Sequence, residues 1–177
     1  MASKMFRANL GISPFYQCGQ SWSSEKTSCG KTMCEEGCYI TSAAMVLTYN
    51  GYNVDPGTLR NAIKPYDCPI DFSVVATRYR LKYTRVDKNF EKIRADIFDY
   101  LYYSDTPVMI GVSGSNTHMV VAQGFSGTLS IDPDGNPNYS EITPSMILVN
   151  DPGSKNRTTL AQVLTSYPTV TGYRILE

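Results

Sequence analysis

The segment from Cys38 to Leu47 constrains the fold most, because its apolar residues suit a helix that is buried on nearly every side. Apolar residues recur at the i, i+3, i+4 and i+7 spacing of one helical face, and two further residues widen that face. They are Ile40, Ala43, Ala44, Met45, Val46 and Leu47. Asn50-Gly51 is a typical helix stop and ends the segment.

Cys38 lies in the first turn of this predicted helix, directly after Gly37. The unpaired N–H groups and the positive dipole end of a helix N-terminus favour a thiolate, which is how several hydrolases make a nucleophile. The alternative is a small buried core residue. Glu35 and Glu36 precede Cys38 and disfavour a thiolate unless they are solvated. The same two carboxylates are a candidate determinant of a preference for basic substrate residues.

Composition narrows the class of protein. The chain has 177 residues, enough for one domain with a substantial core. Its 16 basic and 16 acidic residues cancel, and no run of Lys and Arg stands out, so we expect no nucleic-acid partner. No apolar stretch is long enough for a transmembrane segment, and the first nine residues lack the apolar region of a signal peptide.

Five cysteines, all between positions 18 and 68, leave three interpretations open. If Cys38 is a free nucleophile, the remaining four can pair in three ways, which indicates an oxidising destination. Free thiols are the second interpretation, since no secretion signal is visible. A zinc site is the third, although the chain has no C-x-x-C pair and a single histidine. The cysteines available for disulfides are Cys18, Cys29, Cys34 and Cys68. The four candidate zinc ligands are Cys18, Cys29, Cys34 and Cys38.

The two halves of the chain differ in character. Residues 1–34 are polar and irregular, 35–80 read as helical, and 81–177 read as mainly β-structure with one long helix near 89–103. Helices and strands are thus segregated, which favours an α+β fold in one domain, 1–177, with a site in the groove between the halves. The predicted strands are 81–86, 106–113, 117–125, 146–150 and 169–176, and the predicted shorter helices are 55–63, 71–79 and 158–164.

His118, the only histidine, begins an apolar strand 80 positions after Cys38. Asp151 follows the next predicted strand, 33 positions further on. An imidazole can take the thiol proton, and a carboxylate on its other nitrogen fixes its orientation and stabilises the imidazolium. Asn150 is an alternative third residue and points to the other side of the strand. Asp132, at a predicted turn, is another.

Acyl transfer also requires hydrogen-bond donors for the oxyanion. The backbone N–H of Cys38 is one candidate. A glutamine upstream of the nucleophile is the natural second donor, and Gln17 and Gln20 compete for this place.

Four short motifs resemble those of papain-like cysteine peptidases of the bacteriocin-processing type, family 39 of clan CA. The motifs are Gly37 to Leu47 followed by Tyr49-Asn50-Gly51, Phe15-Tyr16-Gln17 with Trp22, His118 to Phe125, and Val149 to Gly153. The resemblance implies a papain-like fold, with an N-terminal helical lobe packed on a C-terminal antiparallel sheet. It also implies Cys38, His118 and Asp151 as the catalytic triad and places Gln17 ahead of Gln20 as the oxyanion residue.

The function that follows is hydrolysis of peptide or amide bonds without a cofactor or metal. The expected partner is a peptide precursor or a peptidoglycan stem peptide, and the oligomeric state is left open. The expected location is the cytoplasm, or outside the cell after release without a classical signal, as for a phage or secreted lysin. An inactive peptide-binding module is the alternative, because Tyr39 and Ile40 depart from the family pattern of Gly and Pro. An acyltransferase with the same triad is a further alternative.

Overall fold

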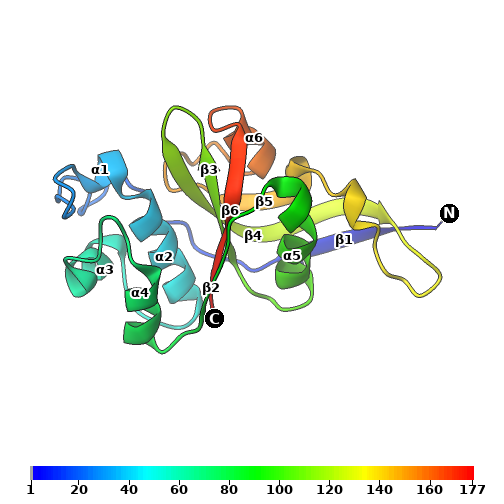
Figure 1. Ribbon diagram of the computed structural model, residues 1–177, viewed down its shortest axis with the longest axis horizontal. Helices are drawn as coiled ribbons and strands as arrows, with labels where there is room; N and C mark the ends of the chain where they lie inside the picture. Colours follow the sequence, from blue (N-terminus) through cyan, green and yellow to red (C-terminus); the bar gives the residue numbers. More distant parts are fainter. Residues whose placement is uncertain (1) are drawn as a thin grey trace.

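The computed structural model describes residues 2–177, which form an α+β fold with a six-stranded antiparallel sheet (Figure 1). The strands are β1 Ser3–Asn9, β2 Tyr83–Val86, β3 Val108–Ser113, β4 Thr117–Ser130, β5 Ile147–Asn150 and β6 Thr169–Leu176. The α-helices are α1 Met33–Glu36, α2 Cys38–Tyr49, α3 Pro56–Ile63, α4 Phe72–Tyr79, α5 Phe90–Tyr102 and α6 Leu160–Leu164, with 3₁₀ turns at Tyr139–Glu141 and Pro144–Met146. Among these residues no helix has the length and apolarity to cross a bilayer.

The sheet is covered on both faces. Its strands follow the order β1-β4-β3-β6-β2, with β5 paired to β4. Along β3, Met109 packs in the core shared with α2, whereas Val108, Ile110 and Val112 pack in the core shared with α5. This alternation follows from the two-residue period of a strand. Figure 1 shows the consequence: α2, α3 and α4 form a helical lobe beside the sheet, and α5 lies apart from them.

Helix α2 is buried as the sequence predicts, with Ile40 through Leu47 all inaccessible to solvent or nearly so. It packs on β4, and the Ser42 hydroxyl donates a 3.3 Å hydrogen bond to the Met119 carbonyl. The predicted starts of the next two helices are also confirmed. The Asp55 carboxylate accepts from the Thr58 N–H, and the Asp71 carboxylate accepts from two N–H groups in the first turn of α4.

Two expectations about the ends of the sheet were wrong. The segment 1–34 is not irregular throughout, because β1 pairs with β4 over its whole length, from Ser3 opposite Ser130 to Asn9 opposite Gly124. For the same reason β4 continues to Ser130, beyond the predicted end of this strand at residue 125. In β1 only Phe6 is fully buried. Because the other positions need not be apolar, the sequence of this strand lacks the alternation of apolar and polar residues that would have predicted it.

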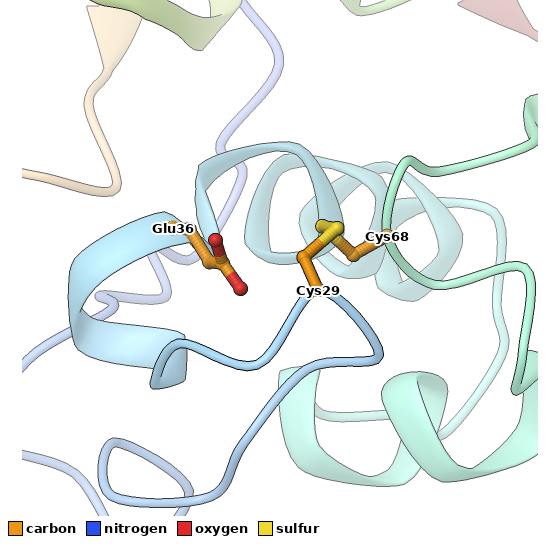
Figure 2. Close-up of side chains that lie close together, drawn as sticks. All are labelled: Cys29, Glu36 and Cys68. Atoms are coloured by element: carbon orange, nitrogen blue, oxygen red, sulfur yellow. A yellow bond between two sulfur atoms is a disulfide. The ribbon is translucent and has the colours of Figure 1, made fainter.

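Four of the five cysteines form two disulfides, Cys18–Cys34 and Cys29–Cys68, and Cys38 is free. This selects one of the three pairings, and it contradicts the zinc interpretation because paired sulfurs are not thiolate ligands. Figure 2 shows Glu36 beside the Cys29–Cys68 bridge. The Glu36 carboxylate is hydrogen-bonded there by the Thr27 hydroxyl and the Lys31 N–H.

Gly172 provides a test of the sheet geometry. Its φ is +152°, and a Cβ at this position lies 2.1 Å from the Val86 carbonyl oxygen on the neighbouring strand β2. Gly172→Ala is therefore expected to lower the free energy of unfolding by about 3 kcal/mol or more. Gly135→Ala is the matched control, because Gly135 also has a positive φ, +83°, but has no atom within 4 Å of the added carbon. That variant should lose about 1 kcal/mol in urea denaturation, and equal losses contradict the close approach.

Candidate active site

Cys38 is the first residue of α2, and Gly37 is the residue that caps the helix. No side chain caps this N-terminus, and within residues 2–177 the Cys38 backbone N–H makes no hydrogen bond. A Cβ on Gly37 would lie 2.5 Å from the Met33 carbonyl oxygen, so the chain can enter α2 from α1 this tightly only with glycine. The Cys38 side chain is buried, with the residue 7% exposed.

His118 is brought to Cys38 by the packing of α2 on β4. Ser42 is one helical turn after Cys38, and Met119 directly follows His118, so the Ser42–Met119 hydrogen bond fixes these two elements in register. The His118 Nε2 atom lies 2.7 Å from Asp151 Oδ1. The Cys38 side chain also acts on His118 and helps to raise the pKa of the imidazole, and Nδ1 is the ring nitrogen that Asp151 leaves free.

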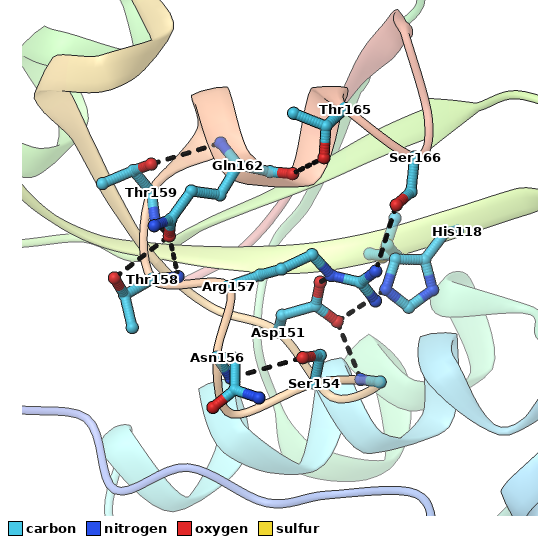
Figure 3. Close-up of polar contacts among 12 residues, drawn as sticks. His118, Asp151, Ser154, Asn156, Arg157, Thr158, Thr159, Gln162, Thr165 and Ser166 are labelled. Carbon is cyan, nitrogen blue, oxygen red and sulfur yellow. Dashed lines mark hydrogen bonds and ion pairs between the residues drawn. The ribbon is translucent and has the colours of Figure 1, made fainter.

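Asp151 follows β5, and its side chain is completely buried. Figure 3 shows this side chain beside those of His118 and Arg157. Its carboxylate accepts three hydrogen bonds of 2.7 Å, from His118 Nε2, the Gly153 N–H and Arg157 Nε. Burial by itself raises the pKa of a carboxyl group, but the hydrogen bonds from His118, Gly153 and Arg157 outweigh it and lower the pKa of Asp151. Asp151 is therefore an anion at neutral pH.

The same contacts act on His118 in the opposite sense. Burial favours the neutral imidazole, but the hydrogen bonds to Asp151 and Cys38 outweigh burial and raise the pKa of His118 to about 9. At neutral pH the ring is thus an imidazolium that donates from both nitrogens, one directed to Asp151 and the other to Cys38. A cation in that position can stabilise a thiolate at Cys38.

Arg157 and Tyr167 belong to this cluster and were missed by sequence reasoning. The Tyr167 ring stacks on the His118 ring with centroids 4.7 Å apart and planes 19° from parallel. The Arg157 guanidinium lies 5.7 Å from the Tyr167 ring centroid while it binds Asp151, as Figure 3 shows for the Asp151 contact. Arg157 stands in a polar loop and Tyr167 precedes a proline, and neither context carries a signal of this role.

The alternative third residues lie elsewhere. The Asn150 amide donates to the Ile12 carbonyl at 2.9 Å, on the other side of the strand from Asp151. Asp132 is in an exposed turn, where it accepts from the backbone N–H groups of Asp134 and Asn136. Neither side chain hydrogen-bonds to His118.

Of the two candidate glutamines, Gln17 is in the site and Gln20 is not. Gln17 is buried, and its side-chain amide donates to the Met33 and Cys34 carbonyls at 3.4 and 3.3 Å. Its backbone N–H donates to the Pro152 carbonyl, next to Asp151, at 2.9 Å. Gln20 is exposed, and its backbone caps a turn with Ser23.

Gln17, Cys38 and His118 line one cleft with a volume of about 950 Å³. The helical lobe forms one wall of the cleft, and the sheet with the Asp151–Arg157 loop forms the other. This is the groove between the two halves that the sequence predicts, and it is large enough for several residues of an extended peptide.

Comparison with known families gave one match. The model described as the Peptidase_C39 like family matches residues 10–174. Comparisons with curated proteins and with solved structures gave no match.

The protonation of His118 can be measured directly, because this is the only histidine of the chain. We expect a single imidazole NMR titration with a midpoint near pH 9, and a lower midpoint in Asp151→Asn because the anionic acceptor is lost. Since the folded-state pKa lies above the unfolded value of about 6.5, this group stabilises the fold fully below pH 6.5 and stops doing so as the pH rises through 9. A midpoint near 6.5 in the wild type contradicts the arrangement.

Proposed function

The chain belongs to the Peptidase_C39 like family, a peptidase family, and from this premise we propose that it is a cysteine peptidase with a Cys38-His118-Asp151 triad. The supporting observation is that Cys38 and His118 line the same cleft, that Cys38 helps to raise the pKa of His118, and that His118 hydrogen-bonds to the buried Asp151 at 2.7 Å. A nucleophile, a base and a group that orients the base are the three parts that acyl transfer needs.

In the proposed reaction the Cys38 thiolate attacks the carbonyl carbon of the scissile amide. The C–N bond then breaks as His118 donates its Nδ1 proton to the leaving amine, which gives a thioester and a neutral imidazole. Water attacks the thioester, and His118 takes up the proton of that water. The C–S bond breaks to release a carboxylic acid and restore the thiolate–imidazolium pair. Asp151 stays ionised and holds the ring throughout.

The oxyanion formed in both steps is placed between the Cys38 backbone N–H and the Gln17 side-chain amide. The Cys38 N–H is not used by the protein among residues 2–177. The Gln17 amide donates to two carbonyls of α1 over long contacts of 3.4 and 3.3 Å, so in this proposal the oxyanion, a charged and stronger acceptor, replaces one of them. Donors fixed in advance of the reaction are what stabilises such a charge.

The proposed substrate is a peptide, either a precursor or the stem peptide of peptidoglycan. The assembled Cys38–His118–Asp151 geometry favours this function over an inactive binding module on the same fold. An acyltransferase would use the same thioester with an amine in place of water. The two disulfides favour an oxidising compartment for the mature protein.

The first test combines labelling with activity. In the unreduced protein we expect iodoacetamide to add one carbamidomethyl group per chain, at Cys38, since the other cysteines are paired. Cys38→Ala should abolish cleavage of a peptide library while the thermal unfolding midpoint stays close to that of the wild type. Cleavage that persists in Cys38→Ala contradicts the proposal, and a folded wild type that binds peptides without cleaving them supports the binding module.

A second test concerns Arg157, which we propose as a positioning residue acting through Asp151. Arg157→Gln removes a charge-assisted hydrogen bond of about 1.5–3 kcal/mol, so kcat should fall roughly 10- to 100-fold with little change in KM. Because a cation near His118 is also removed, the alkaline limb of the pH–rate profile should move to higher pH. Arg157→Lys should restore most of the profile. A uniform loss of folded protein without a change in the pH profile contradicts this role.

A further inference from the structure

Two arginines from neighbouring strands line the sheet side of the cleft. Arg85 on β2 and Arg174 on β6 are paired directly across the two antiparallel strands, and both line the cleft. Among residues 2–177, Asp87 is the one acidic partner of both: its carboxylate lies 2.9 Å from Arg85 Nε and 3.2 Å from Arg174 Nη1. Two guanidinium groups therefore share one carboxylate.

The donors of these arginines are only partly used. Within residues 2–177, Arg174 makes its hydrogen bond and ion-pair contacts through Nη1 alone, to the Tyr173 carbonyl and Asp87. The contacts of Arg85 with Asp87 are made through Nε. A guanidinium carries five N–H donors, so both side chains retain donors for a ligand. The Arg174 side chain is only 14% exposed, and an ion pair there is less screened by water than one at the open surface.

Acidic residues also line the cleft, and all of them belong to the helical lobe; one is Asp67, which accepts from the Ser28 N–H and hydroxyl. Glu35 accepts from the backbone and hydroxyl of Thr32 and belongs to the capping box of α1. Glu36 accepts from Thr27 and Lys31, and Asp71 accepts from two N–H groups at the start of α4. These carboxylates serve the fold. Glu35, Glu36 and Asp71 are each engaged through one carboxylate oxygen, and each belongs to the helical lobe, whereas the two guanidinium groups come from strands β2 and β6 on the other side of the cleft.

The two arginines share the cleft with the nucleophile, Cys38. Tyr39 follows Cys38 and lines the same cleft. Burial raises the pKa of the Tyr39 phenol, and the hydrogen bond with Thr117 and the charges of Arg174 and Arg85 only partly offset this rise. Cys38 acts on the same phenol in the opposite direction. Tyr39 is thus next to the nucleophile on α2 and lines the same cleft as the two arginines.

We propose that Arg85, Arg174 and Tyr39 form a carboxylate subsite, so that the peptidase selects peptides with a carboxylate within a few residues of the scissile bond. The proposal rests on the proposed function. Arg174 is the main ligand, because its planar guanidinium can bind a carboxylate with two parallel hydrogen bonds, and Arg85 and the Tyr39 hydroxyl complete the subsite. This makes Arg174 a specificity-determining residue.

The carboxylate has two sources, an Asp or Glu side chain or the free C-terminus of the peptide. A fluorogenic peptide library with C-terminal amides and Asp, Asn, Lys or Ala at each position within three residues of the scissile bond tests the first source. The same peptides with free C-termini close to the scissile bond test the second. We expect one of the two series to show a kcat/KM about 10- to 100-fold above its neutral analogue, the effect of a hydrogen-bonded charge pair.

Two variants should shift this preference in opposite directions. Arg174→Gln removes the main ligand and should reduce the ratio of acidic to neutral kcat/KM about tenfold, largely through KM. Asp87→Asn removes the internal competitor and should increase the ratio. Lys92→Gln is the matched control, since it removes one positive charge from an exposed position on α5, on the other face of the sheet, and should leave the ratio unchanged.

The two proposals fail in different ways. If the wild type cleaves the library with equal kcat/KM for acidic and neutral peptides, or if Asp87→Asn leaves the ratio unchanged, the carboxylate subsite is wrong and the peptidase assignment stands. If no peptide is cleaved although Cys38 alkylates, the peptidase assignment fails. Asp87→Asn retains both guanidinium groups, so it tests the subsite even where Arg174→Gln fails to fold.

Discussion

The buried carboxylate of Asp151 is the interaction on which the site depends. A buried, ionised carboxylate is costly unless its oxygens accept hydrogen bonds, and three donors from different parts of the chain meet this need. His118 comes from β4, whereas Gly153 and Arg157 come from the loop that follows β5. The hydrogen bonds to the Asp151 carboxylate therefore fix the His118 ring and the loop after β5. They also place the Arg157 guanidinium over the Tyr167 ring.

The second requirement is that a helix start and a strand start meet at the same point. Helix α2 is apolar on nearly all sides, so it can be stable only between the sheet and the remaining helices of its lobe. Its register on β4 is set at Ser42 and Met119. This register brings Cys38 and His118 together. Cys38 lies one turn before Ser42 on the helix, and His118 lies one residue before Met119 on the strand. The packing of α2 on β4 in the core thus positions the two side chains that we propose as catalytic.

Strong local sequence patterns made several helices and strands predictable. The apolar periodicity of α2, the capping signals at Asp55 and Asp71 and the final strand at 169–176 are all present in the sequence and in the structure. The third member of the site could be narrowed because Asn150 and Asp151 must point to opposite sides of the strand. Features that depend on tertiary contacts left no such pattern: β1 is recognisable only from its pairing with β4, and Arg157 only from the carboxylate it binds.

The disulfides connect the covalent structure to the proposed oxyanion site. Cys18 directly follows Gln17, and its partner Cys34 lies in α1. The carbonyls that accept from the Gln17 side chain belong to Met33 and Cys34, in the same short helix. A helix of four residues has little stability of its own. The Cys18–Cys34 bridge therefore holds both the backbone of Gln17 and the acceptors that orient its amide. The bridge also removes the thiols of Cys18 and Cys34, which lie close to the site. With the second disulfide formed as well, Cys38 is the one free cysteine of the five, and disulfides of this kind are typical of proteins in oxidising environments.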